Sequence, residues 1–137
     1  MLRRGGRGSA GRGQGLGEAL HRRAKGALGE RRAARWLTEH GFCIRERNFS
    51  CPAGEIDLVA EEADTLCFIE VKARSSREYG VALEAVTPAK QRRIARTAAW
   101  YLGRHPTELP CRFDVLAMDL EAGEWRYTLV RDAFQIS

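Results

Sequence analysis

Three strand-like segments close together in the chain restrict the fold more than any other feature. They cover residues 42–49, 55–60 and 66–72, and the last two are rich in Ile, Val and Phe. The connections between them are too short to hold a helix. Strands joined in this way pair side by side in opposite directions. The sequence therefore predicts an antiparallel meander.

Two helical patterns flank this meander. The first runs from about residue 19 to His40 and stops at Gly41, a residue type that accepts a left-handed C-terminal cap. The second opens at Thr87-Pro88, an N-cap followed by proline at the first helical position, and closes at Gly103.

Two further strands, residues 112–120 and 125–131, follow the second helix, and Glu121-Ala122-Gly123 joins them as a hairpin. This order predicts an α/β fold, with a single mixed β-sheet flanked by helices in αβββαββ order. Because the chain has 137 residues, of which 44% are apolar, we expect one folded domain over residues 19–137.

The first helix has an apolar stripe that one acid interrupts. Glu30 falls in the middle of the stripe, where an unpaired carboxylate would be costly to bury. It must reach the edge of the core or lie in a polar pocket with a partner. The apolar stripe is Ala27, Ala33, Ala34 and Leu37, and the charged side is Arg31, Arg32, Arg35 and Glu39.

The N-terminus carries the positive charge of the chain. Residues 1–25 hold a net charge of +6, and the remaining residues hold −1. Residues 1–18 are rich in glycine and arginine and cannot bury enough apolar surface to offset their ordering entropy, so we expect a disordered basic tail. We interpret it as a solvated leader; an arm that attracts phosphate groups and an organellar transit peptide are the alternatives.

Membrane and disulfide-bonded proteins do not fit this sequence. It has no run of about 18 uncharged apolar residues, and its N-terminus lacks the apolar stretch of a secretory signal, so we expect a cytoplasmic protein without a membrane partner. No Cys-x-x-Cys motif is present, and we interpret the cysteines as reduced and mostly packing residues. They are Cys43, Cys51, Cys67 and Cys111.

Acidic residues recur inside the apolar strands. We expect Asp57 to lie opposite Glu70, with residues 62–65 as a four-residue turn between their strands. Side chains alternate along a strand, so Glu70 and Lys72 project on the same face. In the preceding strand, alternation places Glu55, Asp57 and Val59 on one face and Ile56, Leu58 and Ala60 on the other.

Two interpretations fit the patch that we expect Asp57, Glu70 and Lys72 to form. Adjacent carboxylates suit Mg²⁺ or Mn²⁺, which take one or two carboxylates together with water and phosphate oxygens. Alternatively, Lys72 neutralises Glu70 in a surface cluster of opposite charges. We favour the site, because the acids lie in apolar strands and because Lys72 is one of three lysines in a chain whose other cationic side chains are arginines.

Five short motifs point to a known family. They are Ala27-Leu28-Gly29-Glu30, Gly54-Glu55-Ile56-Asp57-Leu58, Phe68-Ile69-Glu70-Val71-Lys72-Ala73-Arg74, Ala85-Val86-Thr87-Pro88-Ala89-Lys90 and Arg112-Phe113-Asp114-Val115. Together they resemble the YraN family of small bacterial proteins, over residues 26–134. That family is similar to the restriction-endonuclease-like PD-(D/E)XK nucleases, especially the archaeal Holliday-junction resolvases.

The resemblance implies roles for four residues. Asp57 and Glu70 become the ligands of Mg²⁺ or Mn²⁺, and Lys72 becomes the superfamily lysine, which orients water and stabilises developing negative charge. Glu30 becomes the helix carboxylate that resolvase-like members place near the metal. The chain departs from the superfamily pattern at Ile56, where proline is usual, although that position binds nothing. Glu55 is either an outer acid or a strand-end residue, and we favour the strand end.

The second helix has a basic face around an aromatic residue. We predict that it binds nucleic acid through Lys90, Gln91, Arg92, Arg93, Arg96 and Trp100. With Arg104 nearby, a protein interface or a ring lying under arginine side chains explains Trp100 better than direct base stacking does. Gln91 fits either a polar position near the active site or a hydrogen bond that caps the helix.

Asp114 lies in the strand that follows this helix. We interpret it as a buried partner of Arg112 or Arg74 rather than as a catalytic group.

These observations predict a metal-dependent nuclease that hydrolyses phosphodiester bonds in DNA. The resemblance favours branched or structured DNA, and cutting two strands would require a homodimer. The alternative is a non-catalytic nucleic-acid-binding or adaptor protein that retains the nuclease fold. The basic tail does not distinguish DNA from RNA.

Overall fold

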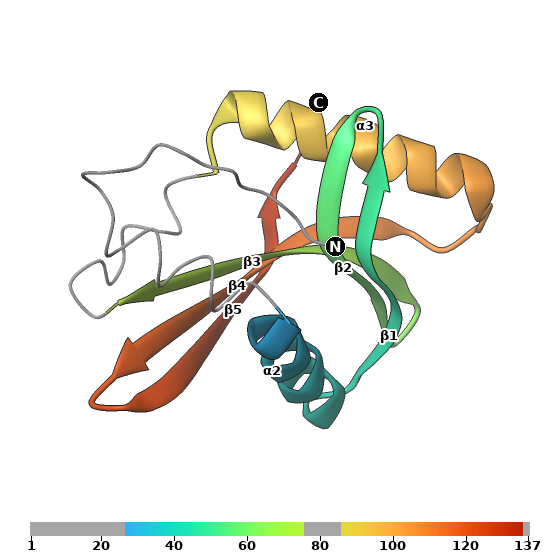
Figure 1. Ribbon diagram of the computed structural model, residues 1–137. Coiled ribbons are helices and arrows are strands. Elements are labelled where there is room, and N and C mark those ends of the chain that lie inside the picture. The colour runs from blue at the N-terminus through green and yellow to red at the C-terminus, as the bar shows by residue number, and fades with distance from the viewer. Residues whose placement is uncertain (1–26, 76–85, 136–137) are drawn as a thin grey trace.

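A five-stranded mixed sheet forms the centre of the protein. The structure is a computed structural model that describes residues 27–75 and 86–135. The strands lie in sequence order, and only β3 and β4 run parallel (Figure 1). Their bounds are β1 Phe42–Cys51, β2 Gly54–Glu62, β3 Thr65–Ser75, β4 Cys111–Glu121 and β5 Glu124–Phe134.

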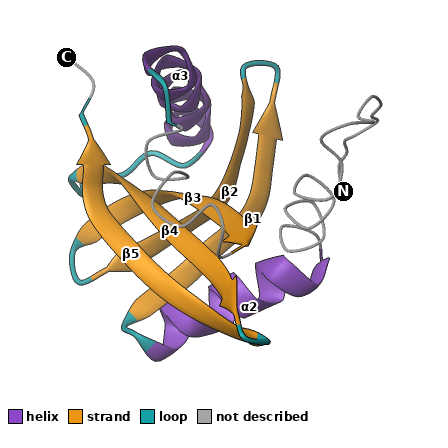
Figure 2. Cartoon of the chain, turned by 90° about the vertical axis from the view of Figure 1, so that its left-hand side faces the viewer, coloured by secondary structure: helices purple, strands orange, loops and turns teal. Residues whose placement is uncertain are grey.

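Two helices cover opposite faces of this sheet. They are α2, Ala27–Glu39, and α3, Pro88–Arg104, and Figure 2 shows the sheet between them. This arrangement confirms the predicted αβββαββ order and is consistent with a restriction-endonuclease-like fold. Within the described residues, neither helix is long and apolar enough to cross a membrane.

The helix ends follow the predicted signals. The Thr87 hydroxyl accepts a hydrogen bond from the Lys90 backbone N–H at 3.2 Å, and Pro88 occupies the first turn. Helix α3 ends at Arg104, one residue beyond the predicted end. Helix α2 ends at Glu39, two residues before Gly41, whose φ is +98°. The predicted start of the first helix near residue 19, and the tail over residues 1–18, lie outside the described residues.

The sheet separates two apolar cores. On the α2 face, Leu58, Ile69 and Leu116 pack against Leu37 and its neighbours. The α3 face is packed by Ile56, Val59, Phe68 and Val115 from the strands with Ile94, Ala98 and Tyr101 from the helix. The predicted apolar stripe is buried at Ala33, Ala34 and Leu37; the side chain of Ala27 lies outside the described set.

The predicted register of β2 and β3 is confirmed from Leu58↔Ile69 to Glu62↔Thr65, but the predicted pair of Asp57 and Glu70 is not part of this ladder. The turn between them is shorter than predicted, because Glu62 and Thr65 still pair. Only Ala63 and Asp64 remain in the turn, and Ala63 has φ +53°. The hairpin between β4 and β5 closes in the same way at Ala122 and Gly123, both with positive φ, as two-residue hairpin turns favour.

Strand β2 changes direction at Asp57. It pairs with β3 only from Leu58 onward, whereas its pairing with β1 continues to Cys51↔Gly54. The predicted alternation was therefore wrong for Ile56, which packs in the α3-side core although Leu58 packs in the α2-side core. The bend carries the β1–β2 ribbon toward α3 (Figure 1).

Gly54 allows this ribbon to rest on the helix. Its φ is +147°, and a Cβ added there would lie 3.1 Å from Oγ1 of Thr97 and 3.2 Å from Cγ of Arg93. Any larger residue would meet both the backbone strain and these side chains. The tip of the β1–β2 ribbon is thus packed against α3.

The cysteines are free thiols, as predicted, but they do not all pack in the core. Cys67 is buried, and its burial raises the pKa to about 12, which keeps the thiol protonated. Cys51 is half-buried. Cys43 and Cys111 are exposed, so the prediction that most of the cysteines are packing residues was wrong.

Candidate functional site

The candidate site lies where β2 separates from β3. Asp57 is the first residue beyond the ladder, and its Oδ2 accepts a hydrogen bond from the Val71 backbone N–H at 2.8 Å. The side chain is largely buried, with 8% of the residue exposed. The carboxylate thus bonds to the β3 backbone at the point where strand pairing ends.

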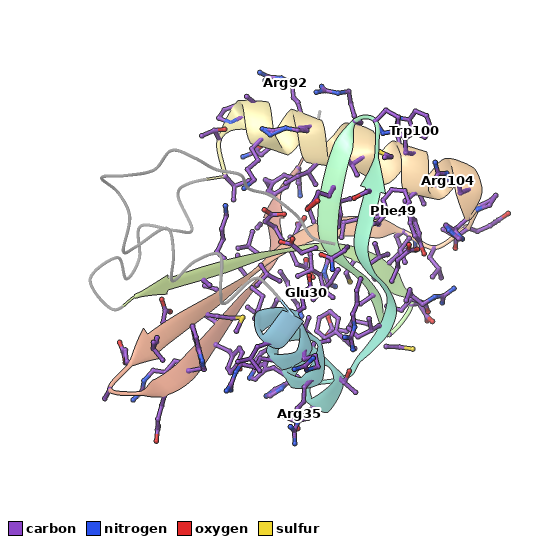
Figure 3. All side chains as sticks on the ribbon, in the orientation of Figure 1. Glu30, Arg35, Phe49, Arg92, Trp100 and Arg104 are labelled. Atoms are coloured by element: carbon purple, nitrogen blue, oxygen red, sulfur yellow. The ribbon has the colours of Figure 1, made fainter. Side chains whose placement is uncertain are left out.

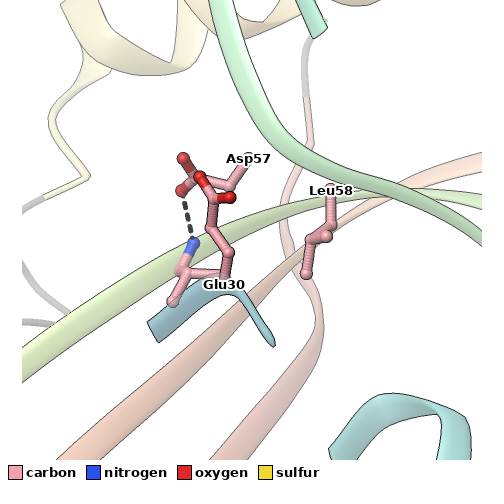
Figure 4. A pocket seen from close by; sticks show the side chains of 4 residues that line it. Glu30, Asp57 and Leu58 are labelled. Atoms are coloured by element: carbon pink, nitrogen blue, oxygen red, sulfur yellow. Dashed lines mark hydrogen bonds between the residues drawn. The ribbon is translucent and has the colours of Figure 1, made fainter. Parts of the chain in front are cut away.

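Glu30 approaches the same point from α2. Figure 4 shows Glu30, Asp57 and Leu58 around a small cavity that Val71 also lines. The cavity volume is about 10 Å³, which is room for about one water molecule or ion. The side-chain amide of Asn48 donates a hydrogen bond to the Glu30 carboxylate. Glu30 interrupts an apolar stripe because its carboxylate lines this cavity together with Asp57 and has Asn48 as a hydrogen-bond partner, as one of the two predicted alternatives required.

Glu70 follows Ile69, the last β3 residue that pairs with β2, and it forms ion pairs with two lysines. Nζ of Lys90 is 3.0 Å from Oε2 of Glu70, and Nζ of Lys72 is 4.0 Å from the same oxygen. Glu70 and Lys72 are both buried. Lys90 comes from the first turn of α3, so two elements far apart in the sequence meet at one carboxylate. The predicted pairing of Lys72 with Glu70 is present, and Lys90 joins it.

The side chains proposed to bind a metal ion at this site, Asp57 and Glu70, are both carboxylates. Among residues 27–75 and 86–135, no three or more His, Cys, Asp or Glu side chains are grouped as a ready metal site. Asp57 and Glu70 are hard oxygen donors on neighbouring strands, and Mg²⁺ is commonly held by one or two carboxylates with water completing its shell. The chemistry of these residues therefore fits Mg²⁺ or Mn²⁺. Glu55 is exposed, which agrees with a strand-end residue.

The outer face of α3 is basic and carries an exposed aromatic residue. Arg92, Arg93 and Arg96 are exposed, and Trp100 is 44% exposed. The Arg104 guanidinium carbon lies 5.6 Å from the Trp100 ring centroid and 5.6 Å from that of Phe49, and Figure 3 places these three residues close together. Arg104 therefore lies over the Trp100 ring, which agrees with the interpretation that this ring lies under arginine side chains.

Gln91 serves the local structure of α3. Its side-chain Nε2 donates a hydrogen bond to the Val86 carbonyl at 2.9 Å. This contact is the capping type of bond that the sequence allowed, and it holds the chain that enters the helix.

A second charged cluster lies at the other end of the β2–β3 ladder. Asp114 is fully buried and accepts hydrogen bonds from Nε of Arg112 at 2.9 and 3.1 Å. Arg112 also donates to Glu62, and Arg131 holds Glu62 through two nitrogens at 2.6 and 2.8 Å. The hydrogen bonds from Arg131 lower the pKa of Glu62 to about 2.

Arg112 is therefore the partner of Asp114; the side chain of Arg74, the other candidate, lies outside the described set. Sequence reasoning did not identify Glu62 or Arg131. Glu62 was assigned to a turn, and Arg131 lies 69 positions away from it, so no local spacing joins them.

Comparison with known proteins identifies similar chains in several bacteria. The model of Uncharacterised protein family UPF0102 matches residues 29–118. The UPF0102 protein of Alkalilimnicola ehrlichii is 48% identical over 102 residues, covering 73% of this chain and 81% of the relative. That of Alcanivorax borkumensis is 46% identical over 108 residues, covering 77% and 86%. That of Symbiobacterium thermophilum is 47% identical over 114 residues, covering 82% and 97%.

Proposed function

Because the chain belongs to the family UPF0102, whose description assigns no reaction, we propose a function from the site itself: a metal-dependent nuclease that hydrolyses phosphodiester bonds in DNA. One observation carries the proposal. Two buried carboxylates, Asp57 and Glu70, come from adjacent strands where the ladder between these strands ends; Asp57 lines a cavity, and Glu70 forms ion pairs with two lysines. Branched or structured DNA is the proposed substrate, through the resemblance to resolvases.

Asp57 and Glu70 are the proposed ligands of Mg²⁺ or Mn²⁺. The ion would supply positive charge that polarises a phosphoryl oxygen and makes a nearby water more acidic. The hydrogen bond from Val71 fixes one oxygen of Asp57, so the carboxylate is held in place before any ligand binds. Such preorganisation lowers the cost of binding.

Lys72 and Glu30 have complementary roles in this proposal. Lys72, whose Nζ lies 4.0 Å from Oε2 of Glu70, stabilises negative charge that builds on the phosphoryl group. Glu30 holds a water molecule in the cavity through its carboxylate, which the Asn48 amide orients. Both groups act without forming a covalent bond to the substrate.

The exposed arginines of α3 are the proposed contacts to the DNA backbone. Arg93 lies at i+3 from Lys90 and is its neighbour on the helix surface, so it joins the arginine face to the side of α3 that contacts Glu70. Phosphate contacts of this kind position the nucleic acid without reading its sequence. A nuclease for cellular DNA would act in the cytoplasm, and it would need a homodimer to cut two strands.

A second candidate function is a nucleic-acid-binding adaptor. It is favoured by the charge balance around Glu70, where two lysines already neutralise the carboxylate. In an adaptor these ion pairs would serve stability alone, and binding of branched DNA would not depend on a divalent cation.

A cleavage assay distinguishes the two candidates. Purified protein is incubated with duplex, forked and four-way-junction DNA and with Mn²⁺ or Mg²⁺, in parallel with Lys72→Ala. We expect cleavage by the natural protein and a loss of about 10²-fold or more in the variant. Equal cleavage by both proteins would implicate a contaminant or a different site. Binding without cleavage in either metal would favour the adaptor.

A further inference from the structure

Two lysines contact the same oxygen of Glu70, but their side chains differ in how freely they can move. Lys72 projects from the same strand as Glu70, and only 10% of its side chain is exposed. Lys90 is closer to the oxygen, at 3.0 Å, yet 29% of its side chain is exposed and it comes from a different element. Lys90 can therefore turn into solvent by rotating its side chain, whereas Lys72 is enclosed.

The backbone under Lys90 is firmly held. The Lys90 N–H donates to the Thr87 hydroxyl, and the Gln91 side chain donates to the Val86 carbonyl. Lys90 also lies in the first turn of α3, where the helix dipole disfavours a positive charge. The ion pair with Glu70 offsets this unfavourable position. Any movement that separates the pair must come from the side chain.

We propose that Lys90 is a displaceable counter-ion of Glu70. It neutralises the carboxylate until a divalent cation binds, and its released ammonium then contacts a phosphate of the DNA backbone beside Arg93, which lies at i+3 on the same side of α3. This inference rests on the proposed nuclease function and adds a regulatory step to it. Because DNA supplies a new partner for the released ammonium, each ligand strengthens the binding of the other.

Mn²⁺ titration of the full-length chain tests the first half of the inference. In Lys90→Met the cation no longer competes with an ammonium, so we expect its dissociation constant to fall about 5- to 20-fold. Arg92→Met is the matched control, because it removes one positive charge two residues further along α3 from a side chain that has no ion pair with Glu70, and we expect less than about a twofold change. Lys90→Arg keeps a cation within reach and is expected to resemble the natural protein.

DNA binding tests the second half. The probe is a short fluorescent duplex with phosphorothioate linkages, which resist hydrolysis, and its affinity is measured by anisotropy with and without Mn²⁺. We expect Mn²⁺ to tighten binding about 5- to 20-fold in the natural protein and about twofold or less in Lys90→Met. Circular dichroism verifies that each variant is folded.

The outcomes separate this inference from the proposed function. If Glu70→Gln loses Mn²⁺ binding while Lys90→Met binds as the natural protein does, the metal site stands and the displaceable role of Lys90 is overturned. A natural protein that binds no Mn²⁺ would overturn both. Tighter Mn²⁺ binding in Lys90→Met with unchanged coupling to DNA would overturn the transfer of the ammonium to phosphate.

Discussion

Glu62 and Glu70 lie on adjacent strands and are each held by two basic side chains, but the partners differ in kind. Arg131 holds Glu62 with two hydrogen bonds at 2.6 and 2.8 Å, and Arg112 adds another. Glu70 has an ammonium at 3.0 Å and a second at 4.0 Å from one oxygen. Arginine forks fix both oxygens of a carboxylate, whereas a lysine presents a single point of charge.

The two clusters differ in whether their acids are available for chemistry. Around Glu62 the arginines join three elements, since Arg112 also holds the buried Asp114 and Arg131 belongs to β5. Glu70 lies instead just beyond the end of the β2–β3 ladder, where Asp57 also leaves the ladder and lines a cavity. We interpret the arginine-held cluster as a structural support of the sheet and the lysine-held cluster as the site.

Asp57→Asn is expected to have the largest effect. Nuclease activity should fall about 10³-fold, because the variant loses a metal-binding charge at the proposed reaction centre. Unfolding free energy should change by less than about 1 kcal/mol, since the amide oxygen can still accept the Val71 N–H. Cleavage rates and urea denaturation measure the two effects. A variant that keeps full activity would remove Asp57 from the site.

Asp114→Asn should show the opposite combination of effects, a loss of stability with unchanged Mn²⁺ affinity. Asp114 is fully buried, and the substitution removes the charge paired with Nε of Arg112 and leaves Arg112 with Glu62 alone, so we expect a loss of about 3 kcal/mol of stability in urea denaturation. Mn²⁺ affinity, measured below the unfolding transition, should remain unchanged. Normal stability together with weakened Mn²⁺ binding would reverse the roles assigned to the two clusters.

Glu62→Gln is expected to change the acid stability. The pKa of Glu62 is lowered from 4.5 to about 2 in the folded protein, so its contribution is complete above about pH 4.5 and is lost as the pH falls toward 2. The variant should lose about 1 to 2 kcal/mol at neutral pH, because Glu62 is partly solvated, and should show a flatter decline in acid. Urea denaturation at several pH values measures this, and an unchanged acid profile would contradict the assignment.

Glu30→Gln should have the smallest effect. Its side chain borders the cavity and bonds to Asn48, but it is not a proposed metal ligand. We expect Mn²⁺ affinity to fall about two- to fivefold, because one nearby negative charge is lost, with little change in stability. A complete loss of Mn²⁺ binding in titration calorimetry would instead make Glu30 a direct ligand.

Much of the fold could be predicted because local rules decide it. Period-two alternation and short connections fixed the meander, and Thr87-Pro88 marked the start of α3. Alternation failed at Ile56, since β2 bends at Asp57 and Ile56 turns to the other core. A bend of this kind depends on packing of the β1–β2 ribbon against α3, which no local pattern contains.

The site was only partly predictable for the same reason. The strand pattern pointed to Asp57, Glu70 and Lys72, and the apolar stripe pointed to Glu30. The contact of Lys90 with Glu70 depends on how α3 is placed within the crossover from β3 to parallel β4, so its spacing in the sequence carried no signal. Glu62 and Arg131 meet only because β5 folds back along β4.

The most direct test of the account is to locate a cation in the protein. Crystals soaked in Mn²⁺ give an anomalous scattering peak wherever the ion binds. We predict one strong peak within about 2.5 Å of a carboxylate oxygen of both Asp57 and Glu70, with Lys90 displaced from Glu70. A peak only at Glu62 or Asp114, or no peak near Asp57 at saturating Mn²⁺, would contradict the account.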